Sequence, residues 1–141
     1  MSMTQDEPVA ELSAKECWEL LELEEFGRLA YRLVDEVHVV PINYVADRGV
    51  LLFRTASGNK LLAAALHSDV AFEIDWHDER VAWSVVARGR LRRLPEDEAS
   101  RVEPRLVEPW VSAPRYDVVE IIPESVSGRR FVLRRPDAGT G

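Results

Sequence analysis

The stretch Leu52-Phe53-Arg54-Thr55-Ala56-Ser57-Gly58-Asn59-Lys60 is the most informative part of this chain. An apolar run ends there in a cation, two hydroxyl groups, a glycine and a second cation, and strong helix formers follow over residues 61–66. This order predicts a strand, a turn and a helix, with Ser57 as the N-cap. A helix start offers unpaired N–H groups to an anion, and Arg54 and Lys60 add positive charge, so the stretch fits a phosphate. An ordinary strand-to-helix turn with two solvated cations explains the local pattern equally well.

Composition narrows the class of protein. The length of 141 residues and a hydrophobic content of 46% predict one globular domain with a substantial core. No apolar run approaches the length of a membrane helix, and residues 1–7 lack the features of a signal peptide. The single cysteine, Cys17, excludes an internal disulfide and is expected to be a small buried hydrophobe. We therefore expect a cytoplasmic protein without a membrane partner.

Charge is unevenly distributed along the chain. The formal net charge is −7, and residues 1–25 hold eight acids against one base, which accounts for all of it. This acidic excess disfavours nucleic acid as a partner. We expect residues 1–11 to form a flexible acidic tail, residues 12–135 to form a single domain, and residues 136–141 to form a flexible C-terminal tail.

Local signals predict two short helices. Ser13 and Glu16 have the spacing of a capping box, in which each side chain accepts a hydrogen bond from the backbone N–H of the other residue. Apolar residues at helical spacing follow, and Gly27 is expected to end this helix. A second helix is expected after Pro95, because proline is favoured in the first turn of a helix.

From Arg28 onward the apolar residues alternate, which predicts strands. Asp47-Arg48-Gly49 and Asp78-Glu79 are expected to form tight hairpin turns. The expected strands cover residues 28–33, 37–45, 50–54, 70–76, 81–92, 116–122 and 129–133. Hairpin-connected strands with a few short peripheral helices indicate a mainly β, antiparallel barrel or sandwich. The sequence contains no G-x-G-x-x-G or P-loop motif, which argues against Rossmann and P-loop folds.

Five motifs follow one another along the chain: Val40-Pro41-Ile42-Asn43-Tyr44, Phe53 to Lys60, Val70-Ala71-Phe72-Glu73-Ile74-Asp75, Trp83-Ser84-Val85 and Ser127-Gly128-Arg129-Arg130. In order and spacing they resemble the FMN-binding split-barrel proteins related to pyridoxamine 5'-phosphate oxidase. Within that family the chain is most similar to the small bacterial branch that includes the nitroimidazole-resistance proteins. The resemblance covers residues 12–133.

The resemblance implies a homodimer of antiparallel split β-barrels, with one FMN bound at each end of the subunit interface. The residues that it places at the cofactor are Arg54, Thr55, Ser57 and Lys60 around the phosphate, Pro41, Ile42, Asn43 and Tyr44 along the isoalloxazine ring, and Trp83 and Ser84 near the flavin, reaching the site of the partner subunit. A flat ring suits a flat β surface, and a dianionic phosphate needs several donors. For Trp83 a place in the core is the alternative, because it alternates with Val81 and Val85.

Candidates for a catalytic role are few. His77 is a candidate because an imidazole titrates near neutral pH, and Tyr44 is one because its ring could stack over the flavin. For both residues a purely structural role is the alternative. No set of His, Asp and Glu residues has the spacing of a metal site, so no metal is expected.

We therefore expect an FMN-binding oxidoreductase that passes a hydride or electron pair between NAD(P)H and a small substrate. One alternative uses the deazaflavin F420 in the same fold, since both cofactors present a phosphate and a flat tricyclic ring. The other is a non-catalytic flavin- or haem-binding protein for storage or sensing. Residues 125–141 do not match the pyridoxal-phosphate-binding segment of pyridoxamine 5'-phosphate oxidase, so vitamin B6 oxidation is not expected.

Overall fold

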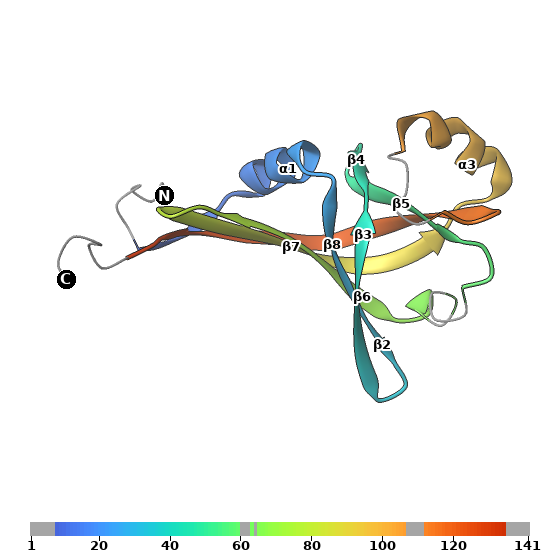
Figure 1. Ribbon diagram of the computed structural model, residues 1–141, viewed down its shortest axis with the longest axis horizontal. Coiled ribbons are helices and arrows are strands. Elements are labelled where there is room, and N and C mark those ends of the chain that lie inside the picture. The colour runs from blue at the N-terminus through green and yellow to red at the C-terminus, as the bar shows by residue number, and fades with distance from the viewer. Residues whose placement is uncertain (1–7, 60–62, 64, 107–111, 135–141) are drawn as a thin grey trace.

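A computed structural model describes residues 8–59, 63, 65–106 and 112–134 of the chain (Figure 1). Strands dominate, and the short helices α1, α3 and η1 lie at the periphery. The elements are β1 (Val9–Leu12), α1 (Ala14–Leu23), β2 (Phe26–Leu33), β3 (Glu36–Asn43), β4 (Val45–Asp47), β5 (Val50–Ala56), β6 (Asp69–His77), β7 (Val81–Arg93), α3 (Glu96–Val102), η1 (Glu103–Arg105) and β8 (Tyr116–Val132).

All strands belong to one antiparallel sheet with the order β3-β2-β6-β7-β8-β5-β4, and β1 pairs with β8. β3 and β4 stand at opposite ends of this order, yet only Tyr44 separates them in the chain. The two ends of the sheet therefore come together, and the sheet closes into a barrel. The expected fold class, an antiparallel split β-barrel with short peripheral helices, is confirmed.

The core fills the barrel and is closed by α1. Strand residues such as Leu29, Phe72 and Val85 are at most 1% exposed, and Cys17 and Leu21 of α1 are fully buried against them. Burying each large apolar side chain contributes about 1.5–3 kcal/mol. The predicted capping box positions α1, because Ser13 Oγ accepts from the Glu16 N–H at 3.1 Å and the Glu16 carboxylate accepts from the Ser13 N–H at 2.9 Å.

Two hairpins shape the ends of the barrel. The β4–β5 turn consists of Arg48 (φ 50°) and Gly49 (φ 83°), both left-handed, as a two-residue type I′ turn requires. The β2–β3 hairpin projects from the body in Figure 1 and carries three exposed valines, Val34, Val37 and Val39.

Three boundary predictions are wrong. The first helix ends at Leu23, and Gly27 lies inside β2, where a Cβ would collide with Phe72 and with the Glu73 carbonyl. Residues 9–11 are not part of a flexible tail, because they pair with the end of β8. Residues 116–122 and 129–133 belong to one strand up to Val132, because a register shift opposite Arg88 and Gly89 accommodates Pro123 and its missing N–H.

The helix expected over residues 61–66 is only partly described. Ala63 and Ala65 are helical, whereas Leu61, Leu62 and Ala64 lie outside the described residues. Across the described ranges, none of the helices has both the length and the apolar character needed to cross a membrane.

Candidate functional site

The end of β5 and the following turn hold three of the expected phosphate ligands. The backbone N–H of Ser57 donates to the Arg115 carbonyl at 3.0 Å, and its hydroxyl donates to the Asp117 carboxylate at 3.2 Å. The turn is therefore fastened to the start of β8. Ser57 is not the helix N-cap, because Gly58, which follows it, is left-handed with φ 82° rather than helical.

Arg54 and Thr55 precede this turn and are half-buried. The Arg54 guanidinium donates to the main-chain carbonyl of Glu103 in η1 at 3.1 Å, and Thr55 Oγ1 accepts from the Asn59 amide at 3.3 Å. The structure thus brings Arg54, Thr55 and Ser57 together beside η1. Lys60, the fourth expected phosphate ligand, lies outside the described residues.

Strand register defines a second set of residues on the surface of the sheet that faces away from the core, here called the outer face. Pro41 of β3 lies opposite Arg28 of β2, and Arg28 lies opposite Glu73 of β6. Two residues along β6, Asp75 lies opposite Ser84 of β7. The outer face therefore carries an unbroken path of neighbours from Pro41 to Ser84.

Arg28, Glu73 and Asp75 form a charged cluster in the middle of this path. The Arg28 Nε donates to Glu73 at 2.9 Å, and its Nη2 contacts both Glu73 and, at 2.9 Å, Asp75. The hydrogen bond to Glu73 raises the pKa of Arg28. Burial, reinforced by Asp75, raises the pKa of the Glu73 carboxyl. One guanidinium thus serves two carboxylates, and with both ionised the cluster carries one net negative charge.

The residues of this cluster were not among the site residues predicted from the sequence. Arg28 and Glu73 alternate with buried residues on their strands, but 45 positions separate them, and only the strand register brings them together. Their pairing has no local signal in the sequence.

A groove of about 480 Å³ lies next to the cluster on the outer face. Ala30 and Ala71 sit opposite each other on its floor, and each lies two residues from a member of the cluster. Arg88 pairs with Ala71 on the other side and also lines the groove. A groove of this volume falls within the range of small-molecule sites, about 300–1,000 Å³.

Three of the predicted cofactor residues turn their side chains away from this surface. Ile42 and Trp83 pack against the barrel core, as the alternative for Trp83 anticipated. Tyr44 is 1% exposed, and its hydroxyl donates to the Leu21 carbonyl at 2.7 Å. Burial raises the pKa of Tyr44. The prediction that the Tyr44 side chain stacks over a flavin or acts in catalysis is therefore wrong, because its ring is enclosed by the core.

Pro41 and Asn43 remain available to a ligand on β3. Pro41 is exposed on a strand at the end of the sheet order, where its missing N–H leaves no gap in the ladder. The Asn43 side chain is half-buried and donates to the Glu25 carbonyl at 3.5 Å.

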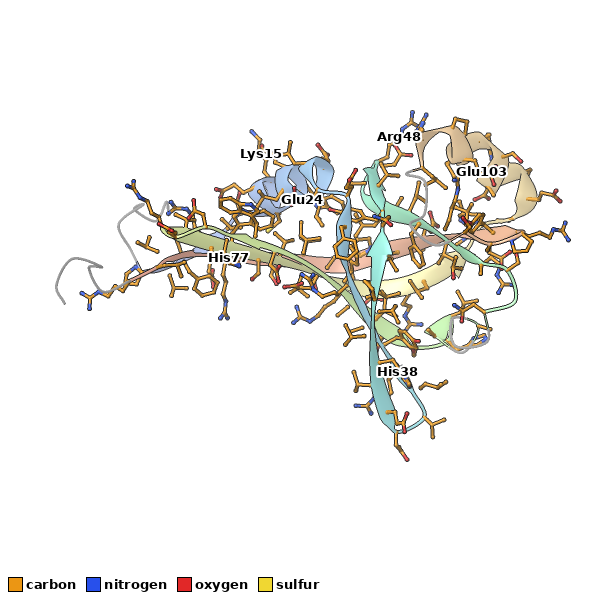
Figure 2. All side chains as sticks on the ribbon, in the orientation of Figure 1. Lys15, Glu24, His38, Arg48, His77 and Glu103 are labelled. Atoms are coloured by element: carbon orange, nitrogen blue, oxygen red, sulfur yellow. The ribbon has the colours of Figure 1, made fainter. Side chains whose placement is uncertain are left out.

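His77 is exposed at the end of β6, where it pairs with Ala82, and it shares the outer face with Asp75 and Ser84. Figure 2 shows His77 and Glu103 at opposite ends of the molecule. The candidate phosphate residues lie beside Glu103, and Ser84 lies on the same face as His77, so they too are far apart. Arg54 lies opposite Val118 of β8 and Ser84 opposite Arg129, eleven residues further along the same strand. At about 3.3 Å per residue this is about 36 Å, so one chain does not bring the two sets together.

The described ranges contain no group of three or more His, Cys, Asp or Glu side chains arranged to hold a metal ion.

The chain is similar to known proteins both in sequence and in fold. Residues 13–130 match the family model described as pyridoxamine 5'-phosphate oxidase. A solved structure of a candidate pyridoxamine 5'-phosphate oxidase from Corynebacterium glutamicum is 32% identical, with a TM-score of 0.80 over 94% of this chain and 100% of the other. An FAD-binding protein from Mycobacterium smegmatis is 36% identical, with a TM-score of 0.74 over 87% of this chain and 98% of the other. A candidate 5-nitroimidazole antibiotic resistance protein from Bacteroides thetaiotaomicron shares the fold at 12% identity, with a TM-score of 0.74 over 93% of each chain.

Proposed function

The chain belongs to the pyridoxamine 5'-phosphate oxidase family, and from this premise we propose that it is a flavin-dependent oxidoreductase that binds FMN. The observation that carries the proposal is that the chain has both a turn rich in hydrogen-bond donors at the end of β5 and a groove on the outer face of the sheet. A relative that binds FAD, at 36% identity, supports a flavin as the ligand class.

The turn fits the phosphate end of FMN. Arg54 supplies a planar set of donors, and Thr55 and Ser57 supply hydroxyl groups within the same four residues. The contact of Arg54 with Glu103 holds the guanidinium beside η1, and the contact of Ser57 with Asp117 holds the turn against β8. Asp117 also lies 3.8 Å from Arg93, which offsets its negative charge. Lys60 would add a further cation to this set.

The outer face fits the ring end. Exposed Pro41 and half-buried Asn43 would lie along the ring with their backbone, because Ile42 and Tyr44 turn their side chains into the core. Ser84 would contribute from the far end of the same face. Arg28 stays positively charged beside two carboxylates and would orient polar atoms of a bound ring rather than transfer protons.

A complete site of this kind needs two copies of the chain. About 36 Å of β8 separates Arg54 from Ser84, which is far longer than one FMN molecule. We therefore propose a homodimer in which one subunit supplies the phosphate turn and its partner supplies Ser84. A symmetric pair then carries two equivalent sites.

When bound, the flavin supplies the capacity to accept and return a hydride or an electron pair. The residues of this chain bind and orient it and leave the outer face open to a nicotinamide donor and a small substrate. His77 would be the proton-handling candidate, because it is exposed on the outer face beside Asp75 and Ser84.

The test is spectroscopic. The purified protein should show a bound-flavin absorption spectrum and should bind FMN more tightly than riboflavin, which lacks the phosphate. Anaerobic NADPH should bleach the flavin band, and air should restore it. Reduction by reduced F420 but not by NADPH would identify reduced F420, rather than NADPH, as the electron donor. A flavin that stays oxidised under excess NADPH, yet is reduced at once by dithionite, would favour the storage or sensing alternative.

A further inference from the structure

A second cavity, of about 270 Å³, lies between α3 and the β4–β5 hairpin. It sits over a small apolar cluster, separate from the barrel core, that centres on Leu52, Leu94 and Val118. The apolar part of its lining comes from Val50, Leu52, Leu94 and Val102. This cavity opens on the opposite side of β5 from the barrel core and is distinct from the groove on the outer face.

Each of the three acids that line this cavity contacts an arginine, and Arg92 is shared between two of them. Asp47 accepts a two-pronged contact from Arg105 at 2.9 and 3.0 Å. Arg92 donates to Glu98 at 2.9 Å and to Glu120 at 2.8 Å. Each of these carboxylates therefore already has a guanidinium partner.

Two arginines of the lining are different. Arg48 and Arg101 both line the cavity, and within the described parts of the chain neither side chain makes a hydrogen bond or ion pair. Arg48 is held at the tip of the β4–β5 hairpin by its left-handed turn, and Arg101 lies in the last turn of α3. Figure 2 shows Arg48 beside α3. Two guanidinium groups from separate elements thus converge on one apolar-floored cavity without carboxylates of their own.

We propose that this cavity binds a small organic anion, namely a carboxylate with a short aliphatic tail. The paired donors of a guanidinium match a carboxylate, and the aliphatic floor matches a hydrocarbon tail better than a fully polar anion such as phosphate. The volume lies just below the range of drug-sized sites, about 300–1,000 Å³, so the ligand is small.

Sodium hexanoate is the probe, and the full-length protein is used as purified. Isothermal titration calorimetry should show saturable binding of hexanoate, with no such signal for sodium chloride or for the uncharged 1-hexanol. Methyl NMR should show hexanoate-dependent shifts of Leu52, Leu94 and Val102, the apolar residues of the cavity. These methyl groups report the site directly, without any substitution.

The variants Arg48→Asn and Arg101→Gln each remove one guanidinium. Asparagine tolerates the left-handed turn, and glutamine is a good helix former, so both variants should fold. Each should raise the dissociation constant of hexanoate about fivefold or more, and the double variant should abolish binding. Arg32→Gln, on the β2–β3 hairpin outside this cavity, is the matched control and should leave binding unchanged.

Several outcomes would overturn the proposal. They are an absence of saturable hexanoate binding, methyl shifts elsewhere than at the cavity, or equal losses in Arg32→Gln. Binding of 1-hexanol as tight as that of hexanoate would show that the cavity does not recognise the negative charge. Binding of inorganic phosphate as tight as that of hexanoate would show that the cavity does not recognise the aliphatic tail.

Discussion

The hydroxyl group of Tyr44 donates a 2.7 Å hydrogen bond to the main-chain carbonyl of Leu21, and so ties the β3–β4 junction to α1. Tyr44 also packs edge-on against Phe72, with ring centroids 4.8 Å apart. Its side chain is a structural element rather than part of a cofactor site.

Tyr44→Phe should therefore lower the free energy of unfolding while leaving flavin binding unchanged. The substitution leaves the buried Leu21 carbonyl without this donor, which costs about 1–3 kcal/mol. Urea denaturation measures the loss, and flavin titration provides the control. Normal stability combined with weakened flavin binding would return Tyr44 to the site.

Gly89 tests the close approach of β7 and β8 at the register shift. A Cβ on Gly89 would collide with the backbone of Ile122, which cannot move aside as a flexible side chain could. Gly89→Ala should destabilise the protein by about 3 kcal/mol or more. Gly49→Ala is the matched control, because its Cβ meets nothing within 4 Å and only the φ of 83° is unfavourable. It should cost about 1 kcal/mol. Equal losses in the two variants would contradict the close approach.

The turn that joins β6 to β7 gives a pH prediction. The Asp78 carboxylate accepts from the backbone N–H of Arg80 at 2.7 Å and of Val81 at 2.8 Å, and these bonds lower its pKa, with the Val81 bond the larger cause. A lowered pKa means that the carboxylate stabilises the fold above its unfolded value, about 3.9, and that this stabilisation is lost as the pH falls through the folded pKa.

Asp78→Asn keeps an oxygen acceptor but does not titrate. The wild-type protein should therefore lose more stability than Asp78→Asn when the pH falls from 6 to about 3. Thermal denaturation at the two pH values measures the difference. Parallel losses in the two proteins would show that the turn does not depend on the charge of Asp78.

Local sequence signals predicted much of this fold. The capping box of Ser13 and Glu16, the left-handed turn at Arg48 and Gly49, and the strand that leads into Arg54 are all encoded by neighbouring residues. The position of Pro123 within one long strand was not predictable, because it depends on a bulge in the pairing with β7.

In the candidate site too, features formed by neighbouring residues were predictable, and contacts between residues distant in sequence were not. The candidate phosphate turn is contiguous in the chain, so the local sequence together with the family resemblance was enough to propose it. The Arg28–Glu73–Asp75 cluster and the contact between Arg54 and Glu103 join residues that are distant in sequence. The inward orientation of Tyr44 likewise depends on α1, which no local pattern places over the barrel.

Arg54→Gln should weaken the binding of FMN about tenfold to a hundredfold, because it removes the proposed charge-assisted contact to the phosphate. Lys60→Gln should act in the same direction. Riboflavin binding should be nearly unchanged in both variants, and Lys15→Gln, at an exposed position of α1, is the control. Fluorescence titration with the two ligands makes the measurement, and equal losses for FMN and riboflavin would move Arg54 away from the phosphate.

The last prediction tests the two-subunit site. Sedimentation should give about twice the chain mass of 16.0 kDa. Arg54→Gln removes the phosphate contact, and Ser84→Arg places a long side chain on the outer face, so each variant alone should bind FMN poorly. If the two residues act on one FMN from different subunits, a heterodimer of the two variants carries one intact site and one doubly altered site. Random association of equal amounts should therefore restore roughly a quarter of the wild-type sites. Co-refolding the variants and titrating FMN measures this recovery. A mixture that binds no more FMN than the separate variants, or a monomer that binds FMN tightly, would show that a single chain forms the site.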